Sequence, residues 1–324
     1  MTRKNYRKRI IAAIATAPLM IALVGILRPA PASSTVEKDR FWAEKVHTHR
    51  RFNLILAGDS RIYRGFDPQT LEKKLRPYEI EALNFGFSAG GLNSVIYREI
   101  DEKLAPASDL RIVVLGVSPM SLTPLTRKNE HYLQEKNRAF DEVFLRRFIY
   151  PRLTFFEPIS PIGLINSFRG EEKRTGYIES FETGGWVASN KIPPDPEDAL
   201  DEYRREFEGN AISEASIEEL MQQIRQWRRQ GVLVYALRMP STEKMEILEN
   251  EMSGYNEEEI RRQVEAAGGE WLAVANRFDY YSYDGSHLEK ESARKISGEV
   301  AELIKNDLDR KSATLSGGDL PAGQ

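Results

Sequence analysis

The chain alternates short apolar runs with longer segments in which apolar residues recur every three or four positions. This alternation extends from about residue 52 to 306 and is typical of parallel strands joined by crossover helices. It predicts an α/β domain over 52–306 with a parallel sheet. The predicted strands are 53–57, 80–85, 111–115, 232–237 and 271–275.

Two helices are marked clearly in the same pattern. One follows Ser216, which is spaced from Glu219 as in a capping box, and the other spans about 288–306. After it, 307–324 is rich in small and polar residues and is predicted to be a disordered tail. Between about 120 and 210 no clear period is visible, and we expect an insertion that caps the sheet edge.

The N-terminus carries a separate hydrophobic signal. Residues 10–27 are an uncharged run of 18, about 27 Å long as a helix and close to the thickness of one bilayer core. Five basic residues precede this run, so the positive-inside rule predicts a cytoplasmic N-terminus and an extracytoplasmic body. Residues 1–32 are then a membrane anchor and 33–51 a linker. A cleaved signal peptide is the alternative, because Ala30-Pro31-Ala32 has the form of a cleavage site.

Composition removes several classes of function. Cysteine is absent, which excludes disulfides, thiolate nucleophiles and iron–sulfur clusters. The net charge is −3, but the chain after residue 9 has 41 basic against 49 acidic residues, a poor match to nucleic acid. Of the four histidines, His47 and His49 have ligand spacing but no evident third ligand, so we expect no metal and no cofactor.

Two short motifs could carry chemistry. Gly58-Asp59-Ser60 follows the first predicted strand, at the sheet edge where α/β proteins bind ligands. Asp284 stands three residues before His287, so its carboxylate could hold one imidazole nitrogen while the other faces a hydroxyl. Taken singly, the first motif is also an ordinary turn and the second an ordinary helix-start loop with a capping aspartate.

Together the motifs resemble those of the SGNH/GDSL hydrolases, whose first sequence block is Gly-Asp-Ser after the first strand and whose last is Asp-x-x-His before the last helix. The resemblance covers about 52–306. It implies a three-layer α/β/α sandwich around a parallel sheet and acyl transfer through a serine ester. By this match Ser60 is the nucleophile and one backbone oxyanion donor, His287 the general base and Asp284 the residue that orients it.

The two middle blocks match the family less closely. Residues 84–91 resemble the second block, whose oxyanion-binding glycine falls on Ala89 or Gly90. The third block is normally Gly-x-Asn-Asp, whereas 116–119 is Gly-Val-Ser-Pro. Ser118 could donate its hydroxyl, but loss of an oxyanion donor costs about 10²–10³ in rate. This departure argues against a robust free-standing esterase.

An anchored, extracytoplasmic member of this kind resembles the SGNH-like proteins that work beside membrane-bound O-acyltransferases. These include alginate O-acetylation proteins, peptidoglycan O-acetyltransferases and the teichoic-acid D-alanylation protein. The resemblance implies an acetyltransferase or esterase acting on exported polysaccharide, with a membrane-bound O-acyltransferase as partner. A plain carbohydrate or lipid esterase and a non-catalytic subunit of an export or acylation complex are the alternatives.

Substrate contacts are expected from a few residues near the motifs. Arg61 follows the candidate nucleophile and Arg238 ends a strand, so either could hold an anionic sugar or phosphate, or form a surface ion pair. Tyr283 and its neighbours in 280–283 could stack on sugar rings or pack in the core. With Trp186 they are the predicted wall of an acceptor groove.

Overall fold

The computed structural model describes residues 3–27, 35–153, 165 and 176–316. Its centre is a five-stranded sheet in which every neighbouring pair is parallel. The sheet order is β2-β1-β3-β6-β7. The strands are β1 (Leu54–Ala57), β2 (Ala82–Asn84), β3 (Ile112–Gly116), β6 (Leu233–Leu237) and β7 (Glu270–Trp271). Four of the five predicted strands are confirmed, and the fifth, predicted at 271–275, shares only Trp271 with the two-residue β7.

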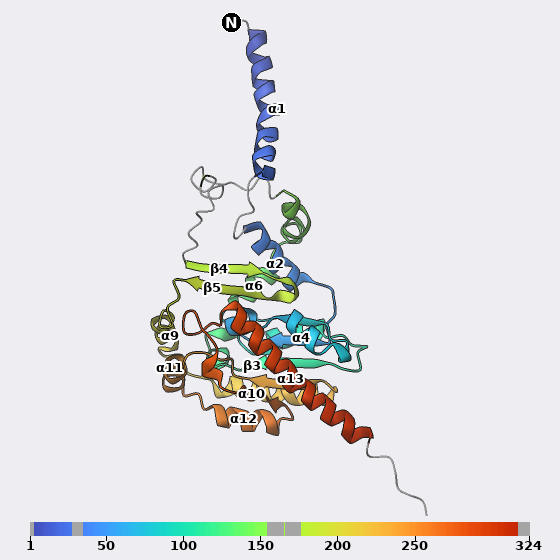
Figure 1. Ribbon diagram of the computed structural model, residues 1–324, viewed down its shortest axis with the longest axis vertical. Coiled ribbons are helices and arrows are strands. Elements are labelled where there is room, and N and C mark those ends of the chain that lie inside the picture. The colour runs from blue at the N-terminus through green and yellow to red at the C-terminus, as the bar shows by residue number, and fades with distance from the viewer. Residues whose placement is uncertain (1–2, 28–34, 154–164, 166–175, 317–324) are drawn as a thin grey trace, which may run out of the picture.

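Successive strand residues face two separate cores, as the two-residue period of a strand requires. Ile55 and Val113 belong to one core, and their neighbours Leu54 and Ile112 belong to the other. Helices cover both faces of the sheet, so the fold is the predicted α/β/α sandwich (Figure 1). The first face is covered by α2 (Thr35–His47), α5 (Ser94–Lys103), α10 (Glu214–Arg229) and α12 (Glu257–Ala266). The second is covered by α3 (Ser60–Gly65), α4 (Pro68–Lys74) and α13 (Lys290–Ser316).

Two segments differ from the sequence-based expectation. The predicted linker 33–51 contains helix α2, whose Phe41, Trp42 and Val46 are buried in the core. The last helix continues from the predicted end at 306 to Ser316. It continues because its extra turns are held to the sheet: Leu308 is buried, and Asp307 accepts a hydrogen bond from the buried Tyr235 hydroxyl at 2.7 Å.

The predicted insertion adds short helices and a hairpin to one side of the sandwich. The helices with α labels are α6 (Glu130–Lys136), α7 (Phe140–Phe144) and α9 (Leu200–Phe207). A π-helix, η4 (Leu145–Ile149), and a 3-10 turn, η5 (Tyr150–Arg152), continue α7. The hairpin pairs β4 (Gly176–Phe181) with β5 (Val187–Ile192) in antiparallel register. Helix α11 (Glu243–Ser253) packs against α9.

The hairpin turn lies against the edge strand β2. Gly185 has a positive φ of 87° and comes so close to Asn84 that a Cβ there would lie 2.3 Å from its carbonyl oxygen. The next residue, Trp186, is buried and donates its indole N–H to the Arg64 carbonyl at 2.8 Å. The insertion therefore covers this sheet edge, as expected.

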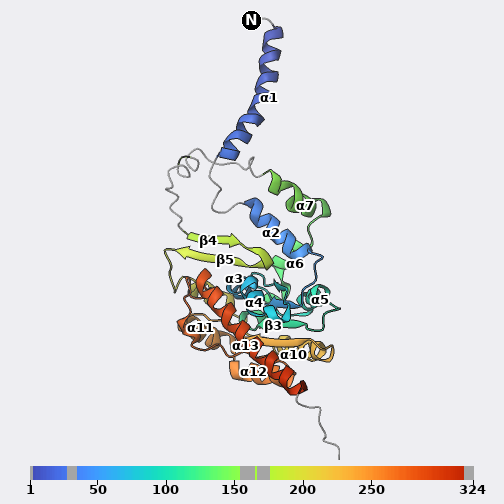
Figure 2. The same cartoon turned by 45° about the vertical axis from the view of Figure 1, so that its right-hand side comes forward.

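The N-terminal run is a long helix, α1 (Arg3–Leu27), that extends away from the sandwich (Figures 1 and 2). Its apolar stretch of 18 residues has a mean hydropathy of 2.6, and none of this stretch is buried in the protein. Within the described ranges it is the one helix long and apolar enough to cross a membrane. The possible cleavage site at 30–32 lies outside the described residues.

Candidate active site

Ser60 stands on the sharp turn that leads from β1 into α3. Gly58 makes the turn possible, because a Cβ there would lie 2.6 Å from Ile62 and 3.0 Å from the Gly116 carbonyl oxygen. Asp59 caps the helix by accepting the Arg61 N–H at 2.9 Å. The half-buried Ser60 hydroxyl is thus presented at the carboxyl edge of the sheet, as the sequence predicted.

His287 and Asp284 lie in the loop before α13 and complete a chain of hydrogen bonds with Ser60. His287 Nε2 lies 2.8 Å from Ser60 Oγ, and its Nδ1 lies 2.8 Å from Asp284 Oδ2. The other carboxylate oxygen of Asp284 accepts the backbone N–H groups of Ser286 and His287 at 2.9 and 2.7 Å. Since the carboxylate accepts from Nδ1, Nε2 is the lone-pair nitrogen that can take the serine proton.

The ionised form of the Asp284 carboxyl is stabilised by the groups around it. Burial alone would raise the pKa of this carboxyl, but the neighbouring His287 and the hydrogen bonds just described lower it well below its ordinary value. Tyr177 adds a longer bond from its hydroxyl at 3.3 Å. Asp284 therefore remains an ionised acceptor that fixes the orientation of the imidazole.

The predicted oxyanion donors separate into two groups. Ser60 and Ala89 have backbone N–H groups without an acceptor in the described part of the chain, and both residues line the same cavity. Gly90 instead donates its N–H to the Phe87 carbonyl at 3.1 Å. Ser118 is buried and donates its hydroxyl to Asp59. The expectation that Gly90 and Ser118 are available as oxyanion donors was therefore wrong.

The loop that carries Ala89 is held in a defined shape. Ala89 has a φ of 48°, a left-handed conformation that is uncommon outside glycine. Asn84, at the end of β2, accepts the Gly86 N–H at 3.1 Å and donates to the carbonyls of Ile62 and Phe66 in and after α3. This side chain joins the loop to the helix that begins with Ser60.

Nothing in the sequence pattern pointed to Lys45, which also contacts this loop. Its ammonium group is buried and donates to the carbonyl oxygens of Gly86 at 2.7 Å and Gly185 at 2.9 Å. The rings of Trp42 and Phe87 lie 5.0 Å from it. Burial lowers the pKa of Lys45 well below its ordinary value. Helix α2, the hairpin turn and the loop that carries Ala89 all contact this one side chain.

A cavity of about 260 Å³ opens above Ser60 and His287. Arg64 and Tyr177 lie on one side of it, and Glu202 and Glu206 of α9 on another. Burial, together with the charges of Glu202 and Asp59, raises the pKa of Glu206. Sequence reasoning missed these four lining residues. Three of them lie in the insertion, where no clear pattern is visible, and Arg64 belongs to no recognised motif.

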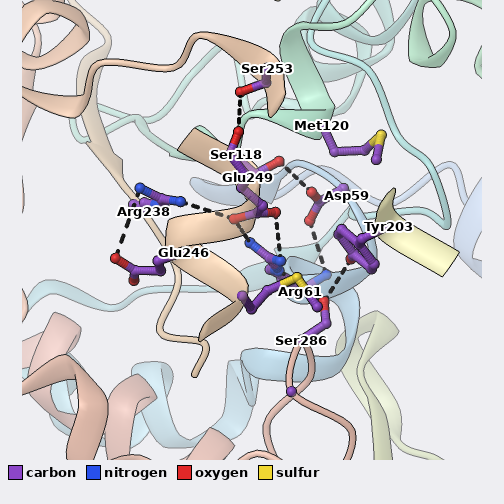
Figure 3. A network of polar contacts seen from close by, with 12 residues as sticks. Asp59, Arg61, Ser118, Met120, Tyr203, Arg238, Glu246, Glu249, Ser253 and Ser286 are labelled. Atoms are coloured by element: carbon purple, nitrogen blue, oxygen red, sulfur yellow. Dashed lines mark hydrogen bonds and ion pairs between the residues drawn. The ribbon is translucent and has the colours of Figure 1, made fainter. Parts of the chain in front are cut away.

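Arg61 and Arg238 do not lie where the substrate-binding prediction needs them. Both are buried, and both donate to the carboxylate of Glu249, which is itself inaccessible to solvent (Figure 3). Arg61 also donates to the Ser286 hydroxyl at 3.1 Å. Burial alone would lower the pKa of Arg61, but Glu249 raises it above its ordinary value. Neither guanidinium lines the cavity, because the buried carboxylate engages them instead.

In the predicted aromatic groove wall, Tyr281 is 45% exposed but does not line the cavity, and the other rings are internal. Tyr283 is fully buried; its hydroxyl accepts from Arg64 at 2.7 Å, and its ring stacks at 6.1 Å on the His287 imidazole. Tyr280 and Trp186 are buried as well. Tyr283 therefore supports the imidazole from behind, and a role in stacking on a sugar ring does not fit its position. His47 bonds to the Glu135 carbonyl through Nε2 at 3.0 Å.

No protein-family model and no curated protein sequence matches the chain. Several solved structures are similar at 11% sequence identity. A provisionally assigned platelet activating factor from Streptococcus pneumonia has a TM-score of 0.37 and covers 83% of this chain and 91% of its own. A provisionally assigned arylesterase from Agrobacterium tumefaciens and an inhibitor-bound aryl esterase from M. smegmatis have TM-scores of 0.33 and 0.34. Each of these two covers 78% of this chain and 99% of its own.

Proposed function

We propose that the protein is a membrane-anchored serine acyl-transfer enzyme of the SGNH type, working outside the cytoplasm as an O-acetyltransferase or esterase on exported polysaccharide. The observation that carries the proposal is the continuous hydrogen-bond chain from Ser60 through His287 to Asp284. A serine hydroxyl is a weak nucleophile by itself and needs a base within hydrogen-bond reach. Here the base, its orienting carboxylate and an open cavity are all present.

In the proposed reaction, Ser60 Oγ attacks the acyl carbonyl carbon while His287 Nε2 takes the hydroxyl proton. The negative charge that develops on the carbonyl oxygen is stabilised by the Ser60 and Ala89 N–H groups. His287 then returns its proton to the leaving alcohol, and an acyl-serine remains. A second hydroxyl, from a sugar or from water, gives its proton to His287 and attacks this ester. The bond to Ser60 Oγ breaks, His287 Nε2 returns the proton to Ser60 Oγ, and the acylated sugar or the free acid leaves.

Transfer to a sugar rather than to water requires that the acceptor be positioned. The cavity above Ser60 shares Glu202 and Glu206 with a larger neighbouring cavity of about 620 Å³. We therefore place the acceptor along α9 in this proposal. A bound acceptor gains several kcal/mol in effective concentration over one that diffuses freely, about 7–11 kcal/mol at most. The basic residues in the first turns of α1, before its apolar run, favour a cytoplasmic N-terminus.

A non-catalytic subunit of an export or acylation complex is the second candidate. The observation that favours it is the Ser118 hydroxyl, which donates to Asp59. The oxyanion site then has two backbone donors and no side-chain donor, and each missing donor costs about 10²–10³ in rate. Such a protein could bind acyl esters with little turnover.

The test uses full-length protein in detergent with an activated acetyl donor and candidate glycans, with and without a membrane-bound O-acyltransferase. Acetate release and glycan acetylation are followed separately, and Ser60→Ala is the control. Glycan acetylation that depends on Ser60 supports the transferase, and Ser60-dependent acetate release alone supports the esterase. The absence of both activities, even with the membrane partner, would favour the non-catalytic subunit.

A further inference from the structure

The helical segment formed by α7, η4 and η5 presents apolar side chains outward. The exposed aromatic face, as we name it, consists of Phe140, Phe144, Phe148, Tyr150 and Leu153. Phe140 is 85% exposed, and Phe144 and Phe148 are each 46% exposed. Phe140, Phe144 and Phe148 are spaced four residues apart, so they follow one side of the helical segment, and the last two rings lie 5.2 Å apart.

Two basic side chains of the same segment are turned toward α2, although Asp141 is exposed and Val143 is buried. Arg146 pairs with Asp39 of α2 at 2.8 Å, and Arg147 donates to the His47 carbonyl at the end of α2 at 3.2 Å. A surface helix of a soluble protein normally does the reverse, with its apolar side on the protein and its charges in water. The three outward rings and the two engaged arginines depart from this pattern, and an apolar partner for the exposed aromatic face would account for them.

The short connection between α1 and α2 limits which partner can contact this face. Only seven residues, 28–34, separate the end of α1 from the start of α2. This length of chain spans no more than about 30 Å, so α2 and the segment packed on it are held close to the end of α1. Figures 1 and 2 both show α7 at the end of the body nearest α1, whereas α13 runs toward the far end.

We propose that the exposed aromatic face docks on the surface of the lipid bilayer that α1 crosses. The proposal rests on the membrane anchorage in the proposed function but not on the chemistry of Ser60. Aromatic and aliphatic side chains of interfacial helices insert about 5–10 Å, to the boundary between headgroups and acyl chains. Docking would fix the orientation of the body over the membrane through the contacts of Arg146 and Arg147 with α2.

The absence of cysteine makes the test direct, because one introduced thiol can be labelled alone. Full-length Phe144→Cys and Phe140→Cys variants carry a polarity-sensitive fluorophore in vesicles of purified phospholipid. Ile247→Cys is the matched control, since Ile247 is 50% exposed on α11. Leu19→Cys in α1 reports membrane insertion of the anchor itself. Quenchers are attached to the lipids either near the headgroup or near the chain end.

We expect blue-shifted emission at 140 and 144, quenched more strongly by the shallow lipid quencher than by the deep one. The label at 247 should remain in water, and the label at 19 should be quenched from within the bilayer. Labels at 140 and 144 that behave like the one at 247 would overturn the proposal, whatever the label at 19 reports. A blue shift without lipid quenching that disappears as the protein is diluted in lipid would assign the face to a second copy instead. None of these results depends on turnover at Ser60.

Discussion

The Arg61 guanidinium forms two hydrogen bonds, at 2.7 and 3.1 Å, with the Glu249 carboxylate in the interior of the protein. Arg61 follows Ser60 in the chain, and its remaining bond reaches Ser286, which precedes His287. One buried side chain therefore joins the segment of the candidate nucleophile to the segment of its candidate base. Figure 3 shows Arg61 between Glu249 and Ser286.

Replacement of Arg61 by methionine should destabilise the protein strongly. Removal of one partner from a buried ion pair typically costs about 3–5 kcal/mol, because the other charge is left without compensation. The measurement is the free energy of unfolding from denaturant titration. Arg40→Met is the control, because its pair with Glu44 is exposed and should contribute no more than about 1 kcal/mol. Equal effects of the two substitutions would contradict the importance of the Arg61–Glu249 pair.

Ser118→Ala should reduce stability but not the reactivity of Ser60. The variant removes the hydroxyl that donates to the buried Asp59, and an unsatisfied buried acceptor costs about 1–3 kcal/mol. The rate of labelling by a serine-directed fluorophosphonate should stay within about threefold of wild type, because Ser118 is not among the residues that line the cavity and its hydroxyl is engaged by Asp59. A fall of about 10² or more would restore Ser118 as an oxyanion donor.

Asp284→Asn should abolish most of any turnover at Ser60. An amide in place of the carboxylate favours the wrong imidazole tautomer, and such a change lowers kcat by about 10⁴ in serine proteases. Tyr177→Phe is the control, since it leaves the Asp284 carboxylate in place, removes the 3.3 Å bonds of its hydroxyl to Asp284 and Asp198, and should cost less than about tenfold. Both rates are measured with an activated acetate ester. A retained rate in Asp284→Asn would exclude the proposed role of Asp284.

The buried Lys45 should make the stability of the protein depend on pH in a defined direction. Burial holds its folded-state pKa well below the unfolded value of about 10.4, so between the two values the unfolded chain binds more protons. Stability relative to Lys45→Met should therefore rise with pH between the folded-state and unfolded-state pKa values. Unfolding titrations at several pH values measure the difference. A difference that falls, or stays constant, would contradict a buried amine with a lowered pKa.

Sequence patterns pointed to the strands and to the candidate triad because both depend on local signals. Each strand is a short apolar run, and Asp284 and His287 are close together in the chain. The alignment of Ser60 with His287 follows from topology, since both lie at the carboxyl edge of one parallel sheet.

Other features depended on distant partners that no local pattern shows. From the sequence, Arg61 and Arg238 resemble surface cations. In the structure the carboxylate of Glu249 in α11 pairs with both of them. Helix α2 resembled a linker because its apolar residues are few, yet they enter the main core. The predicted capping box at Ser216 was wrong, because α10 begins at Glu214 and Glu219 instead accepts the Ser94 N–H at 2.7 Å.

The central claim is that Ser60 is a nucleophile activated by His287, and fluorophosphonate labelling of the full-length protein tests it most directly. Mass spectrometry of the labelled peptides should place the adduct on Ser60, and Ser60→Ala and His287→Ala should each abolish labelling while circular dichroism stays unchanged. Ser88→Ala, which removes an exposed hydroxyl from the same cavity, should label as wild type does. Labelling that persists unchanged in both the Ser60 and His287 variants would contradict the account.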